Sequence, residues 1–561
     1  MNPHLAALAD RYWDLLMESS PTSATLLGDH RFDDRIEDPS REAEDRLLTA
    51  LDAVVAEAAS LDPTALDATD RATREVLLFE SGTQADDLRS RSAEYLVDPQ
   101  IGPHISVVVF IPQLVALDAA QAAAFVTKAS RLGTAFDHAV DRLRDGVTNG
   151  RTPPRVSVEK VLAQLDAYLA SPVEKDPFLA IQPPADMGAE AVADWRRAMQ
   201  EQVEKVVRPA FTRYRAAVAA EVLPAARPPE KSGICWLPDG EEVYRRAVRR
   251  FTSLDLDPRL IHQIGLDGIA ALEEEYRDLG GKVLGTTDLP EIYRRLRTDP
   301  ALRFETGAQV KAQAEASLER ANAATPGWFG VLPKTPCVLT EVPEVGAGDA
   351  PLAFYLPPAV DGSRPGLFFI NTVHPDTRTR YESEALAFHE SVPGHHFQLA
   401  LAQEMTGLPT FRRHALATAY VEGWGLYCER LADEMGLYSG DLERMGMLSF
   451  DSWRYGRLVV DTGLHALGWS RQQAIDYLTA NSPQAPNNIE NEVDRYIGWP
   501  GQALAYKIGQ REILRLRAEA RRALGPAFDI KGFHDTVLTC GPVPLGVLGD
   551  LVQEWARASG A

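Results

Sequence analysis

The chain has 561 residues, of which 45% are hydrophobic and 25% are charged, a composition typical of a soluble globular protein. Acidic residues outnumber lysine and arginine by 80 to 58, which gives a formal net charge of −22 at pH 7. This balance excludes nucleic acid as a partner, because neutralising phosphate requires clustered basic side chains.

The cysteines and the apolar runs indicate the compartment. The four cysteines are widely spaced and form no Cys-x-x-Cys pair, so neither a thiolate zinc site nor a disulfide framework is expected. The start of the chain lacks the pattern of a signal peptide, and no run of eighteen apolar residues occurs. We therefore expect a cytoplasmic protein without a membrane partner, either a monomer or a homodimer.

Residues 1–325 read as helices. Apolar side chains recur at helical spacing from the start of the chain, for example at Leu5, Leu8 and Tyr12, and Ser40 is placed to cap a following helix. Charged residues in this segment need no function, because solvated helix faces account for them. We expect 1–325 to form one wall of a cleft.

Residues 326–372 change in character. Short β-like runs lie at 338–339, 353–356 and 366–371, separated by proline and glycine. They predict a small sheet that lines the cleft, where a peptide could add as a further strand. Arg364 lies in the predicted turn at 361–366 and is either a surface residue or a ligand for a substrate carboxylate.

Residues 389–396, His-Glu-Ser-Val-Pro-Gly-His-His, hold three of the twelve histidines. His-Glu opens the zinc motif H-E-x-x-H, but Pro393 occupies the fifth position and must break the helix. Looping out the break makes His395 the second ligand beside His389. His396 is the alternative ligand, although two helical turns would separate it from His389 by roughly 10.5 Å. We favour His395 and expect His396 either behind the metal ligands, where it supports them without binding the ion, or on the substrate side.

Glu422 is the candidate third ligand. It stands in residues 420–427, Tyr-Val-Glu-Gly-Trp-Gly-Leu-Tyr, in the next helical segment. A carboxylate in such apolar surroundings is normally paired or bound to metal. The alternative is a buried structural pair with arginine or histidine.

Four motifs, at 389–398, 421–427, 457–465 and 499–507, together resemble a bacterial family called domain of unknown function 885. The resemblance extends over nearly the whole chain. That family is grouped with helical zinc metallopeptidases, alongside the angiotensin-converting and oligopeptidase groups. The resemblance implies a mainly α fold with a deep central cleft and one zinc ion per chain, without indicating a substrate.

One helix face carries Arg457, Asp461 and His465 at intervals of four residues. It reads either as a charge ladder that stabilises the helix or as a functional face. In the functional interpretation, Asp461 or His465 orients a ligand histidine or a catalytic group.

The last motif supplies further candidates. The resemblance to angiotensin-converting peptidases implies that the Tyr496 hydroxyl stabilises the oxyanion, with Tyr506 as the alternative. Arg495, Gln502 and Lys507 are expected to bind substrate.

We therefore expect a zinc-dependent peptidase that hydrolyses short peptides, with Glu390 as general base. We expect residues 326–561 to form the catalytic half, with the small sheet, the metal-binding helices and the C-terminal helices. The two halves are expected to form one continuous structural unit. Two alternatives remain open: a zinc hydrolase of a non-peptide amide or ester, and a non-catalytic binding protein that retains the fold.

Overall fold

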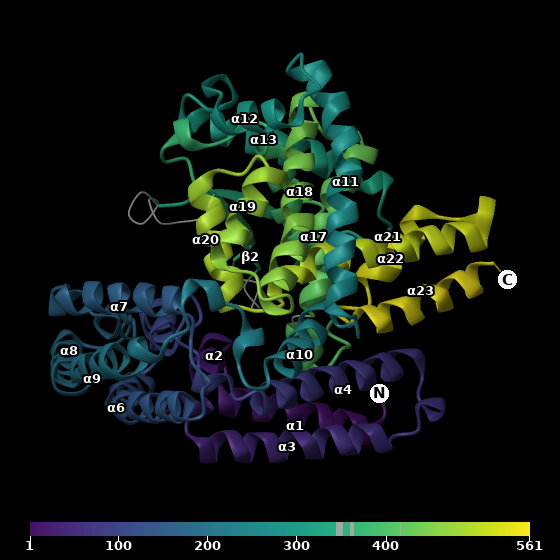
Figure 1. Ribbon diagram of the computed structural model, residues 1–561. Coiled ribbons are helices and arrows are strands. Elements are labelled where there is room, and N and C mark those ends of the chain that lie inside the picture. The colour runs from purple at the N-terminus through teal and green to yellow at the C-terminus, as the bar shows by residue number, and fades with distance from the viewer. Residues whose placement is uncertain (344–351, 359–363, 416, 561) are drawn as a thin grey trace.

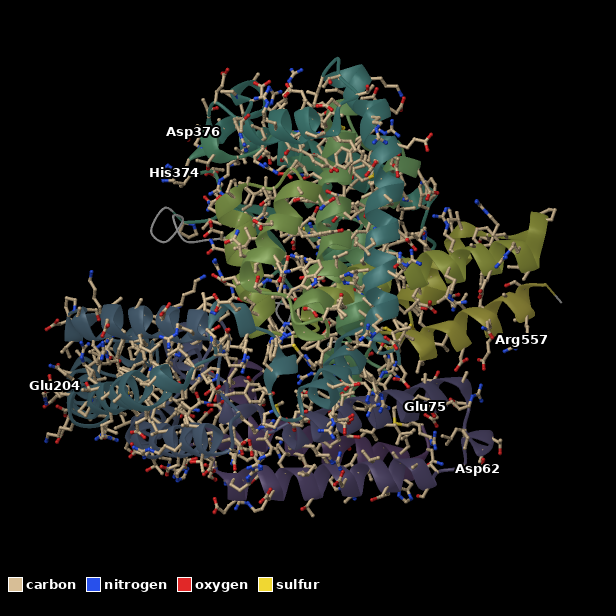
Figure 2. All side chains as sticks on the ribbon, viewed as in Figure 1. Asp62, Glu75, Glu204, His374, Asp376 and Arg557 are labelled. Carbon is tan, nitrogen blue, oxygen red and sulfur yellow. The ribbon has the colours of Figure 1, made fainter. Side chains whose placement is uncertain are left out.

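The computed structural model describes residues 1–343, 352–358, 364–415 and 417–560, which form a mainly helical protein (Figure 1). The mainly α fold class expected from the sequence is confirmed. In this part of the chain, no helix combines the length and the apolar character that crossing a membrane requires. Acidic side chains such as Asp62, Glu204 and Asp376 are exposed at the periphery (Figure 2), where they contribute to the negative net charge.

The N-terminal helices form a layer at the bottom of Figure 1. Leu5, Leu8 and Leu51 are fully buried there, as their helical spacing predicts. The Ser40 hydroxyl caps the third helix by accepting a hydrogen bond from the backbone N–H of Ala43 at 3.2 Å. The helices of this layer are α1 (Pro3–Ser19), α2 (Pro21–Leu26), α3 (Arg41–Ser60) and α4 (Ala68–Arg89).

A lobe at the left of Figure 1 has a hydrophobic core of its own, with buried residues from Val97 to Ala226. Phe136 contacts both Phe211 and Tyr214 in this core, with ring centroids 4.9 and 5.2 Å apart. The helices of the lobe are α5 (Pro103–Ile105), α6 (Ala119–Thr148), α7 (Arg155–Ala170), α8 (Ala189–Gln202) and α9 (Arg208–Ala217).

The largest hydrophobic core joins the two halves that we expected to meet near residue 325. It contains Leu5, Val76 and Tyr244 from the first half, and Tyr420 and Ile513 from the second. The position near 325 therefore does not separate two cores. The lobe has a hydrophobic core that is distinct from this largest one.

The centre of the molecule is built around α18 (Asp441–His465), which is buried along most of its length. Its neighbours include α11 (Pro258–Val283), which runs alongside it, and α14 (Ser383–Glu390). α17 (Thr418–Glu434) packs along α21 (Ala505–Leu524). These contacts place the helices that carry the sequence motifs next to one another.

The remaining helices surround this centre. They are α10 (Gly240–Thr252), α12 (Leu289–Thr298), α13 (Gly307–Ala324), α15 (His395–Glu404), α16 (Thr410–His414), α19 (Arg471–Asn481), α20 (Pro486–Gly498), α22 (Ile530–Leu538) and α23 (Leu545–Ser559).

The described residues contain one three-stranded sheet, which matches the predicted β-like runs. Its strands are β1 (Cys337–Glu341), β2 (Ala353–Leu356) and β3 (Gly366–Ile370), in the order β1-β3-β2. β1 is parallel to β3, with Cys337 opposite Gly366, and β2 is antiparallel to β3, with Ala353 opposite Ile370. Residues 361–363 of the predicted turn lie outside the described residues.

One face of the sheet supports the metal-motif helix. Phe368 and Ile370 of β3 are buried in a cluster with Val310 of α13 and Ala387 of α14. Alternation along the strand places these apolar side chains on one face, which packs on the helices. The sheet therefore holds α14 in position.

Candidate metal centre

The helix that carries His389 is interrupted, as Pro393 requires: α14 ends at Glu390 and α15 begins at His395. The carbonyl oxygen of Pro393 accepts a hydrogen bond from Trp424 Nε1–H at 2.9 Å. A Cβ atom at Gly394 would lie 1.9 Å from the carbonyl oxygen of His389, so only glycine fits there. The interruption therefore turns the chain sharply and begins α15 with a histidine.

Three candidate ligands from α14, α15 and α17 meet beside this break. His389 Nε2 lies 3.7 Å from Glu422 Oε2, and His395 Nε2 lies 3.5 Å from the same oxygen. The two imidazole rings are nearly perpendicular, with centroids 4.7 Å apart. One ligand atom from each residue lies within 4.8 Å of the others, and no second group of this kind occurs in the described ranges.

Gly425 leaves room for the two imidazole rings. It follows Glu422 by one helical turn, and a Cβ atom here would lie 2.8 Å from His389 Nε2 and 3.1 Å from His395 Cε1. Any larger side chain would therefore displace the ligands. Two nitrogens and one carboxylate oxygen form the donor set of many catalytic zinc sites, so the residues present fit zinc.

Without a metal, charge holds the cluster together. Burial alone would raise the pKa of Glu422, but hydrogen bonds with His389 and His395 hold it well below its usual range. Burial alone would lower the pKa of His389, but Glu422 and Glu429 raise it to about 9. A cation that enters at neutral pH must therefore displace a proton from the cluster.

Glu429, which the sequence interpretation missed, lies behind His389. His389 Nδ1–H donates a hydrogen bond to Glu429 Oε1 at 2.8 Å, and both side chains are buried. This bond fixes the tautomer that directs Nε2 toward the cluster. The sequence did carry a signal, because Glu429 follows Glu422 by two helical turns within an apolar stretch.

His396 is excluded as a ligand by its hydrogen bonds. Its Nδ1 accepts from the Tyr355 hydroxyl at 2.8 Å, and its Nε2–H donates to the Thr335 carbonyl at 3.1 Å. Burial lowers the pKa of His396 to about 4, so the ring remains neutral. The first bond ties α15 to β2, and the second ties it to the segment that precedes β1. Because both nitrogens are used in this way, the expected substrate contact of His396 is also wrong.

Glu390 follows His389 directly and is half-buried at the end of α14. Its carboxylate makes no hydrogen bond or ion pair with any other residue that the structure describes. The other two carboxylates of the cluster, Glu422 and Glu429, are paired with histidines. The Glu390 carboxylate is therefore available to accept a proton.

The two tyrosine candidates differ in what surrounds their hydroxyls. The Tyr496 hydroxyl donates to Glu492 at 2.7 Å and accepts from Trp453 Nε1–H at 3.0 Å and Arg457 Nε–H at 2.9 Å. These contacts use its full capacity, so the expected oxyanion role of Tyr496 is wrong. Tyr506 is half-buried, and burial followed by the nearby charge of Glu422 raises its pKa.

The arginines expected around the site form a stacked layer. The Arg457 guanidinium lies over the rings of Trp453 and Tyr506, at 4.4 and 4.5 Å from their centroids. Arg495 Nη1–H donates to Gln502 Oε1 at 2.6 Å. Arg457 and Arg495 thus hold Tyr506 and Gln502 in place.

Asp461 and His465 serve the structure of the scaffold. Asp461 accepts hydrogen bonds from the Tyr244 hydroxyl at 2.5 Å and from the Gly501 N–H at 3.1 Å. His465 accepts from the N–H of Ile234 at 3.0 Å and donates to a backbone carbonyl at 2.9 Å. Neither residue contacts a ligand histidine, so their expected roles beside the metal and in catalysis are corrected.

Lys507 differs from expectation, whereas Arg364 fits the structural alternative that the sequence left open. The Lys507 ammonium is buried in an ion pair with Asp451 and a hydrogen bond to Gln510 at 2.5 Å, so it cannot bind substrate. Arg364 donates to the carbonyl oxygens of Pro357 at 2.7 Å and Pro365 at 3.1 Å, which holds its own loop together.

A cavity of about 480 Å³ reaches the metal cluster at Glu422. Glu422 and Gln502 lie in its wall, and most of the remaining wall comes from α1, α4, α10 and α16. The wall of this cavity therefore combines helices from both halves of the chain.

Comparisons with known proteins support the fold. The model of a family described as a bacterial protein of unknown function, DUF885, matches residues 21–552. A solved structure described as "the putative lipoprotein from Colwellia psychrerythraea" is 27% identical, with a TM-score of 0.90 over 99% of each chain. Another, from Shewanella oneidensis and also described as a lipoprotein "of unknown function", is 18% identical, with a TM-score of 0.76 over 98% of this chain and 99% of that one. The second likeness shows the fold alone. No curated protein matches the chain.

Proposed function

This chain belongs to the bacterial family DUF885, and we propose that it is a zinc-dependent peptidase acting on short peptides. The observation that carries the proposal is the convergence of His389, His395 and Glu422 beside the carboxylate of Glu390, which has no partner among the described residues. A structural ion pair would account for the first three residues, but it leaves Glu390 without a role.

The candidate ligands would hold one zinc ion per chain, with His389 oriented by Glu429. When bound, zinc supplies a Lewis acid that polarises the scissile carbonyl and acidifies water. Glu390 accepts the proton of the attacking water and then delivers it to the leaving amine. A carboxylate that accepts no hydrogen bond from a described residue is suited to this role, because no donor in this part of the chain competes for its lone pairs.

Tyr506 is the hydroxyl that we assign to the developing oxyanion. It lies near Glu422, and the Arg457 guanidinium stacked on its ring holds it in position. Its hydroxyl remains protonated at neutral pH because burial raises its pKa, so it can donate a hydrogen bond.

The test combines metal analysis with a peptide-library digest read by mass spectrometry. We expect about one zinc per chain and cleavage of short peptides. Glu390→Gln should keep zinc and lose roughly 10²–10⁴-fold in turnover. Glu305→Gln, at an exposed carboxylate, is the matched control and should remain active.

Three outcomes would contradict the proposal. Absence of zinc from the wild-type protein removes its basis. Wild-type turnover by Glu390→Gln removes the general base. Zinc without any peptide cleavage favours a hydrolase of non-peptide amides or esters on the same scaffold.

A further inference from the structure

The cavity beside the metal cluster extends away from Glu422 toward the N-terminal helices. Tyr12 of α1 lies in its wall, and so do Glu80 and Gln84 of α4. A volume of about 480 Å³ falls in the range of small-molecule sites and accommodates only a short segment of peptide. The far wall is therefore placed to meet an end or a side chain of a substrate.

Polar atoms on this far wall have no hydrogen-bond partner among the residues that the structure describes. The Glu80 carboxylate and the Tyr12 hydroxyl make no hydrogen bond or ion pair with another described residue. Gln84 Oε1 is buried and likewise lacks a partner within the described ranges. Glu80 and Gln84 stand one helical turn apart, so they lie on the same face of α4.

Arg250 acts on the Glu80 carboxylate through its charge but forms no ion pair with it. Arg250 also lines the cavity, but its guanidinium is paired with Asp87 and lies 5.4 Å from the centroid of the Phe251 ring. No ion pair joins Arg250 to Glu80. Burial raises the pKa of Glu80 to about 7 although the charge of Arg250 opposes this, and a bound cation would favour the ionised carboxylate.

Aromatic rings complete the wall. Trp13 stacks on His414 with centroids 5.3 Å apart, and Tyr12 meets Phe411 edge to face at 5.5 Å. Trp499 also lines the cavity. Aromatic faces attract cations, and rings that pack on one another form a rigid wall.

We propose that Tyr12, Glu80 and Gln84 bind a free ammonium group of the substrate, and that the protein selects short peptides that carry one. An ammonium group has three N–H donors and no acceptor, which matches oxygen acceptors on three side chains. The binding site stands on its own geometry, whereas cleavage of the bound peptide rests on the proposed function.

The first experiment measures binding without hydrolysis. The protein is the zinc-loaded, full-length Glu390→Gln variant, which should bind peptides without cleaving them. The two peptides compared are Gly-Phe-Leu amide and its N-acetyl derivative. By calorimetry, the free peptide should bind roughly 10- to 100-fold more tightly than the acetylated one, since hydrogen bonds to a charged group are lost on acetylation. Adding Glu80→Gln should abolish this preference, and Gln84→Leu should reduce it.

The control is Glu75→Gln on the same helix, at a side chain that is 44% exposed and labelled in Figure 2. It should keep the full preference. An N-acetylated peptide with one lysine separates the two sources of ammonium, because recovered binding assigns the site to the side chain rather than to the N-terminus. Equal affinity for all three peptides, or an undiminished preference in Glu80→Gln, overturns the proposal.

The wild-type protein is then assayed for cleavage of the same peptides. A Glu80-dependent binding preference without cleavage keeps the ammonium site and overturns the peptidase proposal. Cleavage that depends neither on the ammonium nor on Glu80 keeps the peptidase and overturns the ammonium site.

Discussion

His389 and Glu429 are joined by a hydrogen bond of 2.8 Å between two buried side chains on neighbouring helices. The carboxylate sits on the side of the imidazole ring opposite to Glu422. His389 is therefore held between two carboxylates, one available to share a metal and one that fixes the ring.

Replacing Glu429 should weaken metal binding without removing a ligand. Glu429→Gln keeps the shape but loses the charge that raises the basicity of His389, so we expect roughly 10- to 100-fold weaker zinc binding. Competition with a chelator of known affinity measures this change. Glu434→Gln, on the same helix but paired with Arg517, should bind zinc normally. Equal affinity in wild type and Glu429→Gln would show that the contact is only structural.

His395 and His396 should separate metal binding from stability. His395→Ala should lose zinc, because one of three converging ligands is removed. His396→Ala should retain zinc but be destabilised by about 1–3 kcal/mol, since buried partners at Tyr355 and Thr335 lose their hydrogen bonds. Elemental analysis and thermal unfolding of both variants measure the two effects. Loss of zinc from His396→Ala alone would reverse the assignment.

The two tyrosines should have opposite effects. Tyr506→Phe should reduce turnover by about 10²–10³-fold with little change in stability, because it removes one oxyanion donor. Tyr496→Phe should mainly destabilise the fold, since Glu492, Trp453 and Arg457 lose a shared partner. Steady-state kinetics and unfolding midpoints are compared for both variants. Wild-type turnover by Tyr506→Phe would exclude it from catalysis.

Gly425→Ala should impair the metal centre by a steric effect alone. The added Cβ would lie 2.8 Å from His389 Nε2, so the ring must move and zinc binding should weaken by at least about tenfold. Gly546→Ala is the matched control, because no atom lies within 4 Å of its added Cβ. Competition with a chelator measures the zinc affinity of both variants. Normal zinc affinity in Gly425→Ala would contradict the geometry.

Buried neutral histidines should make the protein sensitive to acid. Burial lowers the pKa of both His465 and His534 to about 4, whereas the pKa of a histidine in the unfolded chain is about 6.5. Between these values the unfolded chain binds more protons, so the stability that each histidine contributes is present above pH 6.5 and is lost as the pH falls toward 4. The maximum is on the order of 3 kcal/mol for each histidine.

A substitution isolates this effect. In metal-free protein, His465→Asn keeps an acceptor for the N–H of Ile234 but cannot be protonated. The loss of unfolding free energy between pH 7 and pH 5, measured with urea, should shrink by about 2 kcal/mol relative to wild type. An unchanged loss would show that His465 does not contribute.

Local rules account for what the sequence by itself determined. Helical spacing predicted the mainly α fold, and short apolar runs between prolines and glycines predicted the three strands. Proline lacks the N–H that a helix needs, so the break at Pro393 follows from one residue, and it favoured His395 over His396. These inferences depend on neighbours within a few positions, where steric and hydrogen-bonding rules act directly.

Tertiary packing alone decided the remainder. Tyr496 and Tyr506 carry the same hydroxyl group. Glu492 and Trp453 occupy the hydrogen-bonding positions of the Tyr496 hydroxyl, and they do not bind the Tyr506 hydroxyl. Lys507 pairs with Asp451, which lies 56 positions away in the sequence. Glu80 lines the same cavity as Glu422, although more than 300 positions separate them. No local pattern encodes such contacts, because they arise when separate helices bury their apolar faces against one another.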